Sequence, residues 1–257
     1  ATSNVRPARD LDMPPVGTMG HEHVQRWGSD LAAFRAMRDM RAAGTPSYLL
    51  DTFDTLTSGI PAALQVYRED PHDFSVRYDS GDKVVQYMHA HSIFSEANVD
   101  VKHVIEDGLR PADLDTFEML RRELTHIPDH DQVYGFGGGF VSHHWRNANP
   151  FTRDRVSAVY KLSESSGEPR MKFGNAEGLG KQSIPGRPIV WRRIRGSGHV
   201  SIIAQAGERP PEDFVLLTDN AAAVYDLRMT NAPRPASTTY ILSPRTQNLV
   251  ARVKATL

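Results

Sequence analysis

The stretch Tyr48-Leu49-Leu50-Asp51-Thr52-Phe53-Asp54 (residues 48–54) decides the fold class of this chain. Its apolar residues follow one another without alternation, which is typical of a strand covered on both faces, as in a parallel sheet. The stretch 74–82 has the same layout, because Phe74-Ser75-Val76-Arg77-Tyr78 predicts a strand and Asp79-Ser80-Gly81-Asp82 follows it. The predicted fold therefore contains short strands that are each followed by acidic residues.

Segments with helical spacing separate these strands. Apolar residues recur every three or four positions from His23 to about Ala43, which predicts a helix there. Further helices are predicted at 60–67, 82–91, 100–107 and 114–124, and further strands at 93–94 and 132–136. This alternation predicts an α/β fold with a parallel sheet and crossover helices, either as a barrel or as a doubly wound sheet.

The alternation stops after Asn147. The segment 156–204 is β-rich, with candidate strands at 156–162, 188–194 and 200–204. A chain of 257 residues is long enough for one large domain or two small ones. We expect two, an α/β domain at residues 1–155 and a smaller β-rich C-terminal region at residues 156–257.

The composition excludes several classes of protein. The chain has no Cys, which excludes a disulfide framework, thiolate zinc sites and a Cys nucleophile. Its 30 Lys and Arg balance 31 Asp and Glu, so we expect no bulk binding to nucleic acid or to an anionic membrane. No apolar run approaches the ~18 residues of a membrane span, and the first residues lack the apolar core of a signal peptide. We therefore expect a cytoplasmic protein.

Polar residues gather at the carboxyl ends of the predicted strands, where α/β folds bind their ligands. These positions are His21, Asp51, Asp54, Asp79, Asp82, Glu96 and the glycines 137–139. Each acid has an alternative role as the N-cap of the helix that follows it. That alternative suits Asp82 best, whereas at Asp51 and Asp79 the two interpretations are balanced.

The stretch Gly135-Phe136-Gly137-Gly138-Gly139 follows a predicted strand and favours a phosphate-binding loop. Backbone N–H groups attract an anion there, and glycines let it approach the main chain closely. Arg146 could add a charged fork to the same phosphate. The alternative is a tight turn, and the stretch does not match the dinucleotide-binding pattern GxGxxG because Phe140 stands in it.

Four segments read, in order, Ala1-Thr2-Ser3-Asn4-Val5, Gly17-Thr18-Met19-Gly20-His21, Asp51-Thr52-Phe53-Asp54-Thr55-Leu56 and Val76-Arg77-Tyr78-Asp79-Ser80-Gly81-Asp82. They resemble GTSNV, GTMAH, DTYDTL and VRLDSGD of the nicotinate/nicotinamide phosphoribosyltransferase family. Three later segments resemble the YKL, P-x-MKLS and PGRK of its nicotinate branch: Tyr160-Lys161-Leu162, Pro169-Arg170-Met171-Lys172 and Pro185-Gly186-Arg187. The resemblance spans residues 1 to about 193.

The resemblance implies a type II phosphoribosyltransferase fold, an irregular α/β barrel with a smaller β domain. Residues 1–155 would then form the second half of the barrel. It also implies a reaction of nicotinate with phosphoribosyl pyrophosphate that yields nicotinate mononucleotide and pyrophosphate in NAD biosynthesis. ATP is implied as a co-substrate through a transiently phosphorylated His, and Mg²⁺ would screen the leaving pyrophosphate.

The resemblance also implies roles for single residues. Those that match catalytic positions are His21 as the phosphorylated residue, Asp51 as the acid that orients it, and Asp79 as the acid near the ribose. Those that match substrate-binding positions are Ser3, Arg77, Gly137, Gly138 and Arg146. Asp79 and Asp82 together offer carboxylate oxygens for Mg²⁺.

The family has a long N-terminal half before the segment that resembles residues 1–5. We therefore expect either a fragment or an N-terminal-half polypeptide as a partner, together with a homo-oligomeric partner. Ser3 favours nicotinate, whereas the glycine stretch with Arg146 resembles the nicotinamide branch and leaves a nicotinamide phosphoribosyltransferase open. Glu96 would repel a phosphate at a strand end, which leaves a non-catalytic phosphoribosyl-binding subunit open.

Overall fold

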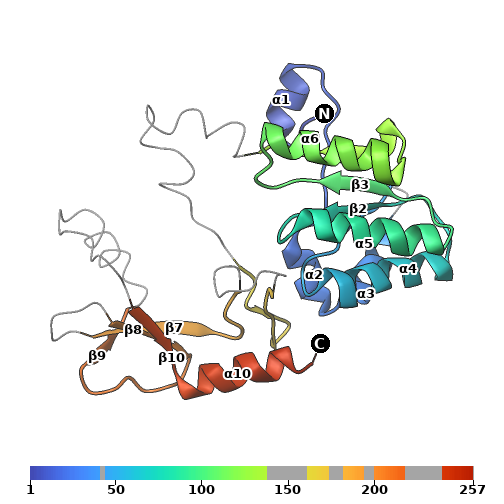
Figure 1. Ribbon diagram of the computed structural model, residues 1–257. Helices are drawn as coiled ribbons and strands as arrows, with labels where there is room; N and C mark the ends of the chain where they lie inside the picture. The colour runs from blue at the N-terminus through green and yellow to red at the C-terminus, as the bar shows by residue number, and fades with distance from the viewer. Residues whose placement is uncertain (41–43, 138–160, 174–181, 194–199, 218–238, 257) are drawn as a thin grey trace. The chain divides into compact units, whose positions relative to one another are not determined.

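The computed structural model describes residues 1–40, 44–137, 161–173, 182–193, 200–217 and 239–256 (Figure 1). The chain forms two compact units, each with its own contacts. The first consists of Ala1–Tyr160 with Lys172–Lys181, and the second consists of Lys161–Met171 with Gln182–Leu257. Lys172 therefore belongs to the first unit although it follows a segment of the second.

A parallel sheet forms the centre of the first unit. Its strands are β1 (Ser47–Leu49), β2 (Ser75–Tyr78), β3 (Lys102–Ile105) and β4 (Gln132–Tyr134), and they lie in the order β1-β2-β3-β4. All three neighbouring pairs are parallel. All three residues of β1 are buried, as expected for a strand covered on both faces, whereas Val133 of β4 is exposed. The predicted α/β fold with a parallel sheet is thereby confirmed.

Helices pack around this sheet, and Figure 1 shows α4, α5 and α6 running alongside the strands. The α-helices in the described part of the unit are α1 (Val5–Asp10), α2 (His21–Trp27), α3 (Asp30–Asp39), α4 (Ile60–Glu69), α5 (Lys83–Glu96) and α6 (Pro111–Leu120). One predicted helix from His23 onwards is in fact two. Gly28 ends α2 in the left-handed conformation at φ +83°, and the side chain of Ser29 caps α3.

Two sequence predictions in this unit are wrong. The predicted strand at 93–94 is part of α5, where the buried ring of Phe94 packs against Phe74. The predicted helix at 100–107 contains the strand β3, whose His103 lies opposite Val76 of β2. Short apolar runs suit a helix or a strand equally, so pairing with β2 decides the outcome.

The second unit is β-rich. Four of its strands form one sheet in the order β10-β8-β7-β9. They are β7 (Pro188–Arg193), β8 (Val200–Gln205), β9 (Phe214–Leu216) and β10 (Thr239–Leu242). A two-stranded ladder joins β5 (Glu164–Ser165) to β6 (Glu168–Pro169), and α10 (Pro244–Lys254) closes the chain. Trp191, Ile202 and Ala204 form its small core.

The strands predicted at 188–194 and 200–204 are therefore confirmed as β7 and β8. Most of the strand predicted at 156–162 lies outside the described residues. Among the helices of the described part of the chain, none combines the length and apolar character needed to cross a bilayer.

Candidate active site

Strand ends and one helix start bring three of the predicted residues together. His21 is the first residue of α2, Asp51 lies just beyond β1, and Asp79 follows β2. Leu50 N donates to Arg77 O at 3.2 Å, so the ends of β1 and β2 lie side by side. One ligand atom from each of His21, Asp51 and Asp79 lies within 4.8 Å of the other two. The cluster thus occupies the strand-end position that α/β folds use for ligands.

The imidazole of His21 is held from both sides. Its Nδ1 lies 3.1 Å from Thr52 Oγ1, and its Nε2 lies 3.1 Å from Asp79 Oδ2. The Nζ of Lys172 also approaches Nε2, at 2.5 Å. These contacts orient the ring and expose one nitrogen to both a cation and an anion.

A backbone contact places Lys172 at the site. The next residue, Phe173, donates its N–H to Thr52 O at 3.4 Å, and its ring packs 5.7 Å from that of Phe53. Lys172 itself is buried, at 3% exposure. Because burying a charged side chain is costly unless it is paired, the contact with Nε2 of His21 helps to stabilise this ammonium group.

The electrostatics of the cluster keep Asp79 ionised. Burial on its own would raise the pKa of Asp79, but the contact with His21 and the charge and hydrogen bond of Arg77 outweigh it. The pKa of this carboxyl therefore lies well below its usual range. The site keeps a fixed negative charge at any pH near neutrality.

Arg77 joins the cluster to its neighbours. It donates from Nη1 to Thr18 Oγ1 at 2.7 Å and to Met19 O at 2.6 Å, and from Nη2 to Asp79 Oδ1 at 2.8 Å. It also forms an ion pair with Glu106, the first residue after β3. Arg77 thus ties the segment before His21 to the ends of β2 and β3.

Gly135 makes room for this ion pair. The backbone just after β4 passes close to the side chain of Glu106, so a Cβ at position 135 would overlap that side chain. A glycine at the end of β4 therefore allows Glu106 to turn towards Arg77.

Asp51 is fully buried and accepts a hydrogen bond from Ser80 Oγ. Its other oxygen finds no hydrogen-bond partner among the described residues. Among the described residues, the polar contacts of the His21 ring are with Thr52, Asp79 and Lys172, and none is with Asp51. The orienting role of Asp51 stays a prediction. The carboxylates of Asp51 and Asp79 lie close together, and Oδ1 of Asp51 is without a hydrogen-bond partner among the described residues. This pair suits a divalent cation, since Mg²⁺ prefers oxygen ligands.

The acids Asp54 and Asp82 serve as helix caps. Asp82 Oδ1 accepts from the N–H groups of Val84 and Val85 at 3.1 Å, and so begins α5. Asp54 accepts from Leu56 and Thr57 in the same way. The capping alternative is thus what the structure shows for both, and magnesium binding by Asp82 stays a prediction.

The substrate-binding predictions have varied outcomes. Ser3 is exposed next to α1, and no described contact joins it to His21. Gly137 is exposed after β4, whereas Gly138 and Arg146 lie outside the described residues. Glu96 is the last residue of α5 and accepts from Ser92 at 3.0 Å, so it does not stand at a strand end as predicted.

Three residues of the cluster were not singled out from the sequence. Thr52 and Lys172 lie in segments that resemble the family, but their residue types gave no separate signal. Glu106 follows a strand that the sequence pattern predicted as a helix, so its strand-end position was not visible.

A histidine between an acid and a lysine at the edge of a parallel α/β sheet is a site suited to nucleophilic chemistry on a bound ligand. Comparison with known proteins agrees with that class. The chain is 31% identical over 207 residues to nicotinate phosphoribosyltransferase of Bacillus subtilis (strain 168), which covers 78% of this chain and 39% of that protein. It is 29% identical over 221 residues to nicotinate phosphoribosyltransferase pncB2 of Mycobacterium tuberculosis, covering 84% and 43%.

A third relative, nicotinate phosphoribosyltransferase of Dictyostelium discoideum, is 28% identical over 176 residues, covering 66% of this chain and 28% of that protein. No family model matches the chain. The resemblance to nicotinate phosphoribosyltransferases is confirmed, and the chain is homologous to part of these proteins. It spans about two fifths of the length of the first two.

Proposed function

We propose that this chain forms part of a nicotinate phosphoribosyltransferase and carries its phosphorylated histidine. The observation that carries the proposal is the contact of His21 with Asp79 and Lys172, in a chain homologous to proteins of that name. The reaction joins the ring nitrogen of nicotinate to C1 of phosphoribosyl pyrophosphate. The bond from C1 to oxygen breaks, and pyrophosphate leaves.

In this proposal His21 couples the reaction to ATP. An unprotonated ring nitrogen attacks the γ-phosphorus, the bond to the bridging oxygen breaks, and ADP leaves. The new phosphoryl group brings negative charge next to the buried Lys172, which can donate charge-assisted hydrogen bonds to it. Lys172 is thus positioned to stabilise the phosphorylated state.

Besides its contact with His21, Asp79 has a role in the transfer step of this proposal. As the bond to pyrophosphate breaks, C1 and the ring oxygen of the ribose gain positive charge, and a fixed carboxylate nearby stabilises that charge. Its depressed pKa supports this role, because the group stays ionised. Arg77 holds Asp79 in place and lines the proposed nicotinate site together with Ser3.

We propose that Gly137, Gly138 and Arg146 bind the substrate phosphate. We propose that Asp51 and Asp79 bind Mg²⁺, since their ligand atoms lie together with that of His21. Asp82, three residues after Asp79, is proposed as a further ligand. When bound, the ion would screen the negative charge of pyrophosphate. Lys172 contacts His21 and adds a positive charge to the same cluster, independently of any metal ion.

The four parallel strands follow one another in chain order, which supports a section of an α/β barrel. We propose that a polypeptide corresponding to the rest of the curated relatives completes that barrel, within a cytoplasmic homo-oligomer.

The test is an assay of the native assembly that contains this chain. With nicotinate, phosphoribosyl pyrophosphate, Mg²⁺ and ATP, it should form nicotinate mononucleotide and pyrophosphate, and nicotinamide should be the poorer substrate. Replacing His21→Ala should abolish the stimulation by ATP and leave slow transfer. Asp79→Asn should slow transfer by about 10²- to 10³-fold, the usual effect of removing one electrostatic group.

Asp12→Asn, in an exposed turn, is the matched control and should leave the rate unchanged. An assembly that yields no mononucleotide contradicts the proposal, and a preference for nicotinamide replaces it with the nicotinamide activity. ATP stimulation that persists in His21→Ala removes the phosphohistidine role.

A further inference from the structure

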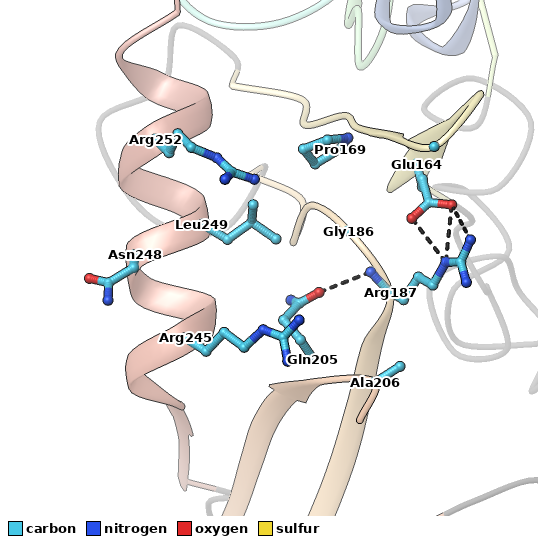
Figure 2. A pocket seen from close by; sticks show the side chains of 11 residues that line it. Glu164, Pro169, Gly186, Arg187, Gln205, Ala206, Arg245, Asn248, Leu249 and Arg252 are labelled. Carbon is cyan, nitrogen blue, oxygen red and sulfur yellow. Dashed lines mark hydrogen bonds and ion pairs between the residues drawn. The ribbon is translucent and has the colours of Figure 1, made fainter. Parts of the chain in front are cut away.

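The second unit contains a cavity of about 430 Å³ between α10 and the loops of the β-rich region (Figure 2). Cavities that bind small molecules usually measure roughly 300–1,000 Å³. All of the lining residues belong to this one unit, and the His21 cluster is not among them.

One face of α10 makes the cavity basic. Arg245, Leu249 and Arg252 are spaced four and three residues apart, which places them on the same side of the helix. Figure 2 shows all three side chains directed into the cavity, whereas Asn248 points away from it. Among the described residues, neither arginine side chain has a hydrogen bond or an ion pair, and α10 contains no acidic residue. Two positive charges therefore face the cavity without a partner from their own helix.

On the wall opposite α10, the two charged side chains neutralise each other. Arg187 and Glu164 form an ion pair at 2.9 Å, with the fork of the guanidinium group against the carboxylate. The lining thus has three arginines and one glutamate, and the excess positive charge lies on α10. An anion is the ligand that this imbalance favours.

The floor of the cavity is rigid. The buried amide of Gln205 accepts from Arg187 N at 2.9 Å and donates to Pro185 O at 3.1 Å, so both of its ends are held. Gly186 adopts φ +84°, and a Cβ there would overlap the side chains of Gln205 and Leu249. A site whose floor is fixed in advance binds a ligand with less loss of entropy.

We propose that this cavity is a second ligand site, which binds a small organic phosphate. The phosphate group would lie against Arg245 and Arg252, since guanidinium groups form paired charge-assisted hydrogen bonds with phosphate oxygens. The body of the ligand would pack on Leu249 and Pro169, the apolar part of the lining. The volume is larger than a free phosphate ion needs, which favours a phosphate ester.

The test is calorimetric titration of the full chain at low ionic strength with two phosphate esters, adenosine 5′-monophosphate and ribose 5-phosphate. Adenosine, ribose and inorganic phosphate are the comparison ligands. At least one ester should bind saturably and more tightly than its unphosphorylated form and than inorganic phosphate. Arg245→Ala and Arg252→Ala should each weaken that binding by about tenfold, as expected for a lost charged hydrogen bond.

Arg209→Ala is the matched control, because Arg209 is exposed in the same unit but does not line the cavity. Glu164→Gln should strengthen the binding by about two- to fivefold, since it frees Arg187 and removes the one negative charge. A misfolded variant cannot show such a gain. Absence of saturable ester binding overturns the proposal, and so does binding that persists unchanged in both α10 variants, which would place the ester at the His21 cluster. The proposal does not depend on transferase activity.

Discussion

The ammonium group of Lys172 lies 2.5 Å from Nε2 of His21, the same nitrogen that lies 3.1 Å from a carboxylate oxygen of Asp79. A ring nitrogen either carries a proton and donates or has a lone pair and accepts. A charged Lys has only donors, so its contact requires Nε2 to accept. Nδ1 then carries the proton and donates to Thr52 Oγ1. Lys172 and Asp79 thus favour opposite tautomers of His21.

The closer contact with Lys172 predicts the tautomer with the proton on Nδ1. Nitrogen NMR of the imidazole should show His21 with a protonated Nδ1 and an unprotonated Nε2 at neutral pH. Lys172→Met removes the donor, so the proton should move to Nε2 and face Asp79. The control Lys254→Met changes an exposed lysine of α10 and should leave the spectrum as it is. A protonated Nε2 in the unmodified protein would contradict this assignment.

The depressed pKa of Asp79 predicts a stability that depends on pH. The folded state holds this carboxyl ionised below its usual pKa, so the stabilisation is complete above about pH 4 and is lost as the pH falls through the folded-state pKa. At pH 7, Asp79→Asn should lower the free energy of unfolding by about 2 kcal/mol, the order of a hydrogen bond to a charged group. The difference between the two proteins should shrink in urea titrations at pH 3. A difference that stays equal at both values, or that Asp12→Asn reproduces, refutes the assignment.

Arg77 predicts a large loss of stability when its charge is removed. Its side chain is only 13% exposed, and its guanidinium group partners both Asp79 and Glu106. Arg77→Met leaves two carboxylates without their cation, so we expect a loss of about 3 kcal/mol in denaturant unfolding. Arg6→Ala removes a comparable ion pair at an exposed site and should cost less than about 0.5 kcal/mol. Similar losses for the two variants would argue against a structural role for Arg77.

His103 predicts sensitivity to mild acid that does not involve the active site. Burial lowers its pKa from 6.5 to about 3, with a smaller effect from His91, and its Nδ1 lies 2.8 Å from Tyr78 Oη. The unfolded state binds a proton at His103 below pH 6.5 and the folded state does not, so stability is lost as the pH falls from 6.5 towards 3. His103→Gln keeps a polar partner for Tyr78 and should reduce this slope by up to about 1.4 kcal/mol per pH unit. Identical slopes in the two proteins would show that His103 is protonated in the folded state.

The sequence by itself determined the parallel sheet and three of its strands. The run 48–50 has the composition of a strand that is covered on both faces, and the runs 74–78 and 132–136 have the composition of strands. It also determined that His21, Asp51 and Asp79 belong at strand ends or next to them. Local patterns determine these features because they depend on neighbouring residues along the chain. The resemblance to nicotinate phosphoribosyltransferases was likewise visible in the order of short motifs.

Only the tertiary structure decided what depends on distant residues. The segment that contains β3 is a strand because it pairs with β2, and this pairing makes Glu106 a partner of Arg77. Likewise, Asp82 caps α5, and the buried Lys172 reaches His21 across 151 positions of sequence. A cation buried beside an imidazole, and a basic cavity below α10, result from chain packing, to which a single sequence gives no direct access.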